Sequence, residues 1–290
     1  MAVSVLQNTI LLGFIYAIMA LGIFLSFKVL NIPDLTVDGS FTSGCAVSAV
    51  LTVMGYPLLG MLLGFVVGML AGVVSGVLQT HCKIPSVLAG ILTMTALYSI
   101  NLKIMNGMPN VSLFGKDTVI TPLQHIFASN GALMLALGLV VLVTVLLYLF
   151  LQTQLGLSLR ATGDNEAMVR ASSINSDTMK ILGLGLANGL VGLGGALFAQ
   201  NQGFADVSGG IGMMVIGLAS ILVGEAFLHK RGIGWQLCSV LLGAIIYQLI
   251  MTFALQLGIA SSDIKLLSAV LVAGAISLSQ LKWKRRKQHA

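Results

Sequence analysis

The sequence predicts an all-α membrane protein that crosses the bilayer about nine times. Its 290 residues are 57% hydrophobic and only 8% charged, whereas soluble domains carry about 25% charged residues. A membrane helix needs roughly 20 mostly apolar residues, and such stretches follow one another almost without interruption from Val5 to Leu281. We therefore expect a single transmembrane domain over residues 1–290.

Nine apolar segments are candidate membrane spans. The first of them follows no charged region and contains no small-residue cleavage site, so we interpret it as a retained span and not as a signal peptide. The nine segments cover residues 7–28, 39–55, 57–79, 86–104, 130–152, 180–201, 210–228, 233–256 and 264–281.

The basic residues predict how the chain is oriented in the membrane. The polar segment 152–176 must leave the hydrocarbon, because unpaired charges there cost several kcal/mol. If it lies in the cytoplasm, nine spans also place most other basic residues there, including those of the tail at 282–290, as the positive-inside rule requires. This orientation puts the N-terminus outside, and a missed or broken span would reverse that end.

Glycine is frequent within the apolar segments. In the segment 57–79 a glycine recurs every four residues, so that these glycines share one face of a helix. Small residues at this spacing let membrane helices approach closely, and we favour such a packing seam over a pore lining. The residues are Gly60, Gly64, Gly68, Gly72 and Gly76.

Two parts of the sequence are weakly similar to each other. Residues 17–51 pass through Pro33-Asp34-Leu35-Thr36, and residues 188–223 pass through Ala205-Asp206-Val207-Ser208. In each part an apolar segment meets an Asp, a hydroxyl residue two positions later, glycines and a second apolar segment. The first part begins outside and the second inside, which predicts an inverted repeat, a common transporter construction. Chance similarity between two glycine-rich spans is the alternative.

The sequence contains no recognisable catalytic or metal-binding pattern. It has no GxSxG, HExxH or GxxxxGK[ST] motif, and its four histidines lie far apart. The three cysteines form no CxxC pair and are interpreted as small apolar residues. We therefore expect no enzymatic activity, no metal site and no cofactor in this chain.

Polar residues interrupt the apolar sequence between the first two spans. A carboxylate at membrane depth is a candidate functional site and could pair with a substrate ammonium. Alternatively, Asp34 or Asp38 caps the helix that we expect from Gly39, after Pro33 has ended its predecessor. Asp206 in the second half has the same two interpretations. The candidate substrate-path residues are Asp34, Thr36, Asp38, Ser40 and Asp206.

Three further polar regions each have two interpretations. Glu225 is expected to form an ion pair with His229, Lys230 or Arg231, with a proton relay as the alternative. The polar residues at 200–202 could line an entrance or simply end a helix in water. The loop 103–130 could receive a partner outside the membrane or serve as a connector.

The polar segment 153–178 is the most informative part of the chain. Asp164 or Asn165 can cap a short helix that begins near Glu166, with Arg170 further along, which suits the charges of helix ends. A short amphipathic helix between two spans is suited to transmitting motion from a soluble partner. A solvated charged loop is the alternative.

This segment resembles the cytoplasmic loop of the branched-chain amino acid and ribose-type family of ABC importer permeases. That family has an R-A-x-G-x-N-x-x-A pattern followed by a Gly- or Ser-Ile pair. In the first half, the run 34–40 is similar to the D-L-S-V-G-S run of the sugar permeases, with Asp38 inserted. The runs 32–41 and 93–101 look most like a subgroup linked with aromatic amino acids. The loop pattern is met by Arg160, Ala161, Gly163, Asn165, Ala167 (one position early relative to some relatives), Ser173 and Ile174.

The resemblance implies a type II ABC importer permease in a bacterial cytoplasmic membrane. Such a permease forms a dimer, binds two cytoplasmic ATPase subunits through the segment 153–178, and receives its solute from an extracytoplasmic binding protein. ATP and Mg would then be bound by the partner ATPase. The solute implied is an amino acid, with an aromatic one favoured and a sugar or nucleoside as the alternative. An ion-gradient-coupled secondary transporter is the rival class, since it would use the same inverted repeat.

Overall fold

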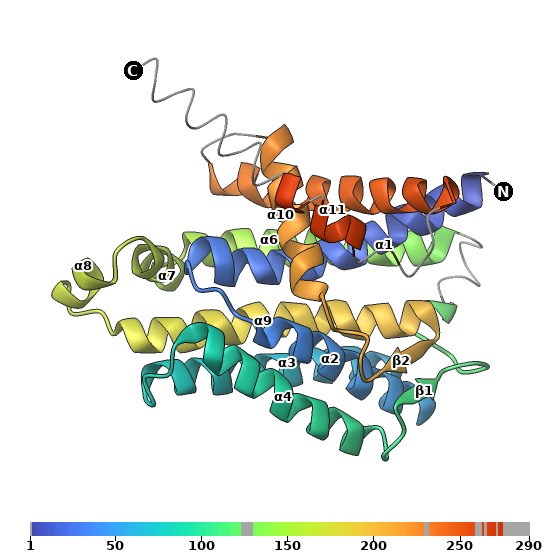
Figure 1. The fold of residues 1–290 in the computed structure, drawn as a ribbon, viewed down its shortest axis with the longest axis horizontal. Helices are drawn as coiled ribbons and strands as arrows, with labels where there is room; N and C mark the ends of the chain where they lie inside the picture. The colour runs from blue at the N-terminus through green and yellow to red at the C-terminus, as the bar shows by residue number, and fades with distance from the viewer. Residues whose placement is uncertain are drawn as a thin grey trace.

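The computed structural model describes residues 2–122, 130–228, 232–258, 263, 266–270 and 272–274, and nearly all of them are helical. Long helices run roughly side by side along the long axis of the molecule (Figure 1). The elements are α1 (Ala2–Ile23), the π-helix η1 (Phe24–Val29), α2 (Thr36–Val53), α3 (Pro57–Thr80), α4 (Ser86–Ile104), β1 (Asn110–Ser112), α6 (Gly131–Gln152), α7 (Gln154–Asp164), α8 (Glu166–Ala171), α9 (Ser176–Gln202), β2 (Phe204–Asp206), α10 (Met213–Phe227) and α11 (Ile233–Gln256).

Six helices of the described chain are long and apolar enough to cross a membrane. The helix α10 is apolar but shorter, and α2 contains the polar residues that the sequence singled out. Eight of the nine predicted spans therefore coincide with a helix, within a few residues at each end. Most of the ninth, 264–281, lies outside the described residues. The fold is that of a multi-pass helical membrane protein.

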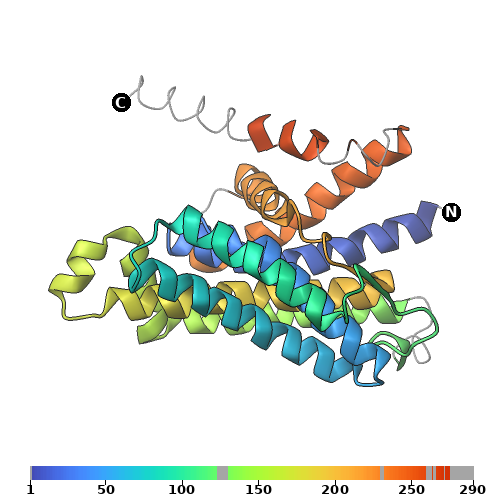
Figure 2. The same ribbon diagram turned by 60° about the horizontal axis from the view of Figure 1, so that its bottom comes forward.

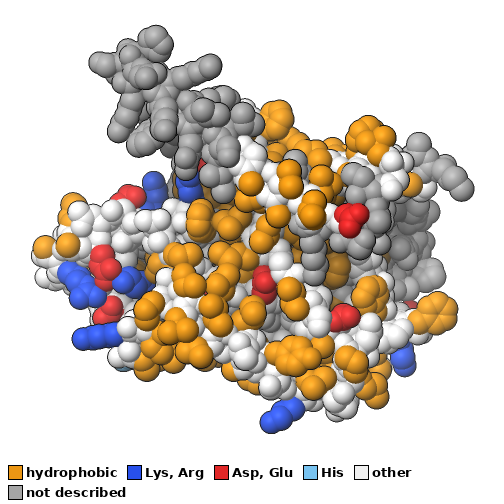
Figure 3. All heavy atoms as spheres, viewed as in Figure 1, with side chains coloured by type: hydrophobic (Ala, Val, Ile, Leu, Met, Phe, Trp, Pro, Cys, Tyr) orange, Lys and Arg blue, Asp and Glu red, His pale blue; other side chains and the backbone are white. Residues whose placement is uncertain are grey.

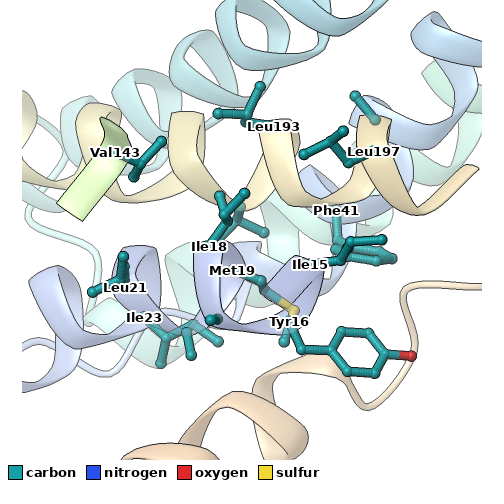
Figure 4. Close-up of a cluster of buried hydrophobic side chains, with 14 of the residues drawn as sticks. Ile15, Tyr16, Ile18, Met19, Leu21, Ile23, Phe41, Val143, Leu193 and Leu197 are labelled. Atoms are coloured by element: carbon teal, nitrogen blue, oxygen red, sulfur yellow. The ribbon is translucent and has the colours of Figure 1, made fainter. Parts of the chain in front are cut away.

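The helix α9 lies in the centre of the bundle and packs against α1, α2 and α3. The close-up in Figure 4 shows Ile15 and Ile18 of α1 beside Leu193 and Leu197 of α9, with Phe41 of α2 in the same cluster. These five side chains are almost completely buried. Because α9 is enclosed by other helices, its position fixes those of its neighbours.

The predicted glycine seam packs α3 against α2 and α9. A β-carbon at Gly68 or Gly72 would meet the backbone carbonyl of Asn188 or Leu184 on α9, and one at Gly60 would meet the backbone of Ser48 on α2. Glycine is therefore required because the helix backbones touch. The packing interpretation of this seam is confirmed, because α2 and α9 cover the glycine face of α3.

Non-helical chain precedes both α2 and α10. Residues 30–35 separate η1 from α2, and residues 207–212 lead from β2 to α10. After β2 the chain turns back toward the middle of the bundle before α10 begins (Figure 1). The two short strands pair antiparallel at one end of the bundle, with Val111 opposite Ala205. At the opposite end lie α7 and α8, which the same bundle seen from another side also shows (Figure 2).

Candidate functional site: the polar break and the segment 153–178

A side chain from the second half of the chain, Asn188 of α9, forms hydrogen bonds with polar residues at the break before α2. Asp34 is 1% exposed, and its carboxylate accepts hydrogen bonds from the backbone N–H of Thr36 at 2.9 Å and from Asn188 Nδ2 at 2.6 Å. Ser40 donates to the Oδ1 of the same asparagine at 2.7 Å. Asn188 therefore satisfies two polar groups of the break, as buried polar groups in a membrane protein require.

Asp34 and Asp38 have different surroundings and different structural roles. Asp34 holds the first turn of its own helix, which begins at Thr36 and not at Gly39. Asp34 therefore accepts a hydrogen bond at the start of α2 from one residue before the N-cap position, Leu35, whereas Asp38 lies within the first turn of α2 and does not cap it. The half-buried carboxylate of Asp38 instead accepts from the backbone N–H groups of Gly212 and Met214, at 2.8 and 2.9 Å.

This second contact places an acidic side chain of the first half at the N-terminus of α10. Unpaired N–H groups and the helix dipole both favour a negative charge there. The chain reaches this position because Gly212 adopts a left-handed conformation, with φ of 92°, immediately before the helix. No local sequence pattern links residue 38 to residue 212, so only the tertiary structure shows this pair.

The other candidates of the predicted substrate path lie close to these two acids or at the end of the bundle. The hydroxyl of Thr36 is fully buried and has no hydrogen-bond partner among the described residues. Asp206 lies in β2, opposite Asn110, and its carboxylate accepts from the backbone N–H of Ser208 at 2.6 Å. Asp206 thus holds the turn after β2 and is not part of the Asp34 cluster.

The segment 153–178 folds into two helices and not one. The expected short helix is α8, and Asn165 is its cap, accepting from the backbone N–H of Met168 at 3.1 Å. The preceding helix α7 was not predicted, although Thr153 caps it in the usual way by accepting from the backbone N–H of Gly156. Because α7 has few apolar residues, the hydrophobic pattern that predicts membrane spans does not indicate it.

The residues that match the permease loop pattern are placed on different sides of this segment. A β-carbon at Gly163 would collide with the backbone carbonyl of Val29, so this glycine allows α7 to touch the end of η1. Ala161 and Ala167 are exposed, whereas Arg160 and Ile174 are half-buried. Ser173 adopts a left-handed conformation, with φ of 61°, in the turn between α8 and α9.

A group of charges that the sequence pattern did not predict joins α8 to α9. Glu166 Oε2 accepts from Lys180 Nζ at 2.7 Å, and Glu166 Oε1 accepts from Arg170 Nη2 at 2.9 Å and from Ser176 Oγ at 3.1 Å. The hydrogen bond from Lys180, followed by those from Ser176 and Arg170, holds the pKa of Glu166 below its ordinary value. The spacing of Glu166 and Arg170, four residues apart on a helix, was the one available sign.

The comparison with known proteins identifies the family. The sequence matches the family described as branched-chain amino acid transport system / permease component over residues 5–278. The chain belongs to this permease family. Members of the family are transport components of ABC systems and not catalysts, and they act with ATP-binding subunits and a substrate-binding protein.

Curated relatives of the permease cover most of its length. It is 38% identical over 290 residues to a tyrosine transport system permease protein of Clostridioides difficile. This alignment covers 99% of this chain and 94% of the relative. It is 30% identical to an uncharacterized protein of Rickettsia prowazekii, over 90% of this chain and 92% of that one. A probable branched-chain amino acid transport permease of Methanocaldococcus jannaschii is 26% identical, over 56% and 53% of the two chains. No solved structure matches the permease.

Two polar residues of the permease have partners that the sequence did not indicate. Glu225 forms an ion pair of 2.7 Å with Lys28 of η1, while the expected partners at 229–231 lie outside the described residues. Gln200 is 4% exposed and does not line an open entrance at this position. It donates to Ser48 Oγ and accepts from the backbone N–H of Val119, both at 2.9 Å.

Charge is distributed unevenly along the permease. Charged side chains of both signs gather at the end that contains α7 and α8, and hydrophobic side chains are spread over the rest of the face seen in Figure 3. Charges at one end beside an apolar lateral surface are expected of a protein that spans a bilayer. Among the described residues no group of three or more His, Cys, Asp or Glu side chains could hold a metal ion.

Proposed function

We propose that this permease forms the translocation path of an ATP-driven importer for an amino acid, with an aromatic amino acid as the substrate. The observation that carries the proposal is the 38% identity, over almost the whole chain, to a permease named for tyrosine transport. The substrate class is taken from this relative. The polar break contains the kinds of group that suit an ammonium and a carboxylate, namely the Asp34 carboxylate and the N-terminus of α10. In this structure Asn188 binds the first and Asp38 binds the second.

The experiment is uptake of labelled tyrosine by the complex of the permease, its ATP-binding subunits and its binding protein in liposomes. We expect uptake that requires ATP and that unlabelled tryptophan or phenylalanine inhibits more strongly than leucine or ribose. If ribose were the only compound that inhibits uptake, the substrate class would be a sugar and not an amino acid. Uptake by the permease without any ATPase, driven by an ion gradient, would instead indicate a secondary transporter.

The segment 153–178 is the proposed binding site for the ATP-binding subunits. Its support is the free face of α8, where Ala167 and Met168 are exposed, with Met168 68% exposed. Arg160, Ala161, Asn165, Ser173 and Ile174 complete the matched pattern around it. ATP and Mg would be bound by those subunits.

We propose that two copies of the permease form a two-fold dimer that binds two ATP-binding subunits. Closed two-fold symmetry matches two equivalent ATPase sites. The translocation path would then lie near the interface between the copies, with a path along Asp34, Thr36, Asp38, Ser40 and Asp206. Native mass spectrometry of the functional complex measures the number of permease copies, and a single copy would contradict the dimer.

Asp34→Asn and Asp38→Asn test the substrate path. If the two carboxylates bind the ammonium group of the substrate, each change lowers transport at unchanged expression. Each carboxylate uses both oxygens as acceptors and Asn offers only one, so the thermal stability of each variant is measured as well. Lower transport at unchanged stability indicates a substrate contact, whereas a purely structural role predicts that transport and stability fall together. Full transport by both variants would leave only the structural role.

The proposed topology has nine spans and an inverted repeat. Its support is that α2 and α10 each follow a non-helical break and that Asp38, beside the first break, contacts the start of α10. Reporter fusions at both ends of the chain test it. Nine spans place the N-terminus outside and the tail 282–290 inside, and fusions on the same side would contradict an odd number.

A further inference from the structure

We infer that Glu166 is a positioning residue that fastens α8 to α9, so that a displacement of α8 becomes a displacement of the transmembrane helix α9. The inference rests on the proposed function, in which α8 contacts an ATP-binding subunit. Glu166 would not itself touch that subunit or the solute. Its role would be to keep α8 and α9 a single mechanical body.

The geometry of the carboxylate supports this role. Both oxygens of Glu166 are used, and two of the three donors, Ser176 and Lys180, belong to α9. Arg170, from the last turn of α8, adds a second connection by donating to Ser176 Oγ at 2.8 Å and to Asp177 Oδ1 at 3.1 Å. The two ends of α8 are thus both tied to the start of α9.

Few other contacts hold α8 against α9, and α8 otherwise packs mainly against α7, from which Asn165 alone separates it. It has six residues, of which only Val169 is fully buried. An isolated helix of this length is not stable in water, so its orientation depends on what it is attached to. The side with Ala167, Met168 and Ala171 is exposed, which leaves the face opposite the charges free for a partner.

The helix α9 is well suited to carry a displacement into the membrane. It is one uninterrupted helix, Ser176–Gln202, and it touches the backbones of α2 and α3 at glycines such as Gly192 and Gly68. Such close packing leaves no room for one helix to slip past another without moving it. Midway along α9, Asn188 holds Asp34 at the polar break. A movement of α9 therefore reaches the proposed substrate path directly.

Single surface ion pairs contribute little, and each of these side chains is partly exposed, from 23% for Lys180 to 57% for Arg170. The arrangement differs from an isolated pair because one carboxylate is shared by three donors from two helices. Networks of this kind constrain geometry better than separate pairs do. Loss of the central carboxylate also removes the hydrogen-bond acceptor that orients Lys180 and Ser176 together.

The first test measures hydrogen exchange of the α8 amides in the full-length permease in nanodiscs. Glu166→Gln should make these amides exchange several-fold faster. Asp164→Asn is the matched control, since it removes the same charge two residues earlier, at an exposed position, and we expect no change there. Unchanged exchange in Glu166→Gln would overturn the inference, whether or not α8 binds an ATPase.

The second test uses the assembled transporter and measures solute molecules moved per ATP hydrolysed. Glu166→Gln and Lys180→Met should each lower this ratio several-fold while the ATP-binding subunit still co-purifies, and Lys180→Arg should restore it. Faster exchange with an unchanged ratio would overturn the positioning role. A different result would contradict the proposal that α8 binds the ATP-binding subunit. In that case Ala167→Trp would still co-purify with the subunit.

Discussion

The carboxylate of Asp34 accepts a 2.6 Å hydrogen bond from the side-chain amide of Asn188, which lies 154 residues later in the chain. Both residues are buried, with 1% of Asp34 and none of Asn188 exposed. The same amide group also serves Ser40. This single side chain therefore joins the polar break of the first half to the central helix of the bundle.

Replacing Asn188 by Leu should destabilise the permease strongly. Asp34 and Ser40 would each lose a buried partner, and each unsatisfied buried group costs about 1–3 kcal/mol. We expect a lower midpoint of thermal unfolding for the detergent-solubilised protein. The change Asn201→Leu, near the end of the same helix, serves as the control because that residue is partly exposed. Equal midpoints for the two variants would contradict the role assigned to Asn188.

Removal of the Asp38 carboxylate should loosen the start of α10. Asp38→Ala deprives Gly212 and Met214 of their acceptor, and the loss of such a cap costs about 0.5–2 kcal/mol. Hydrogen exchange of the first amides of α10 is the measurement, and it should accelerate more in Asp38→Ala than in Asp38→Asn. Protection that persists in Asp38→Ala would show that other contacts hold α10.

A β-branched side chain at Gly192 should prevent the central helices from packing. A β-carbon there would collide with the backbone of Gly64 and approach that of Gly68. Gly192→Val should therefore reduce the yield of folded protein, as measured by the monodisperse fraction in size-exclusion chromatography. Gly138→Val on α6 is the matched control, because a β-carbon at Gly138 meets no atom within 4 Å. Similar yields for the two would refute the packing role.

Bulky residues at two positions of the segment 153–178 should have different effects. Ala167→Trp changes an exposed surface, so the permease should fold normally and lose co-purification with its ATP-binding subunit. Gly163→Leu places atoms where the backbone of Val29 lies, so it should lower thermal stability even without a partner. A Gly163→Leu variant with normal stability would contradict the close contact between α7 and η1.

Protonation of Glu166 should release α8 only in acid. Its pKa is held below the ordinary value by Lys180 and the other donors, so its contribution to stability is present above the ordinary Glu pKa. That contribution is lost as the pH falls through the lowered pKa. Exchange of the α8 amides, corrected for the intrinsic pH dependence, should thus stay constant from about pH 5 to 8. A release of α8 within that range would contradict the lowered pKa.

Much of the fold could be predicted because membrane helices are encoded locally. A run of about 20 apolar residues has few alternatives to a helix in the bilayer, since every backbone group must be satisfied within the segment. Eight predicted spans coincide with helices for this reason. The cap at Asn165 and the seam along α3 were also readable, because each depends on residues close together in the sequence.

The sequence by itself thus determined the class of the protein, eight of its apolar helices and the segment that resembles the permease loop. Only the tertiary structure decided that Asp34 binds Asn188, that Asp38 holds the start of α10, and that Glu166 binds Lys180. The physical reason is the range of the interactions: hydrophobic periodicity and capping act over a few residues, whereas a polar side chain in a bundle takes the partner that packing brings to it. Those partners come from distant helices, and their spacing in the sequence follows no pattern.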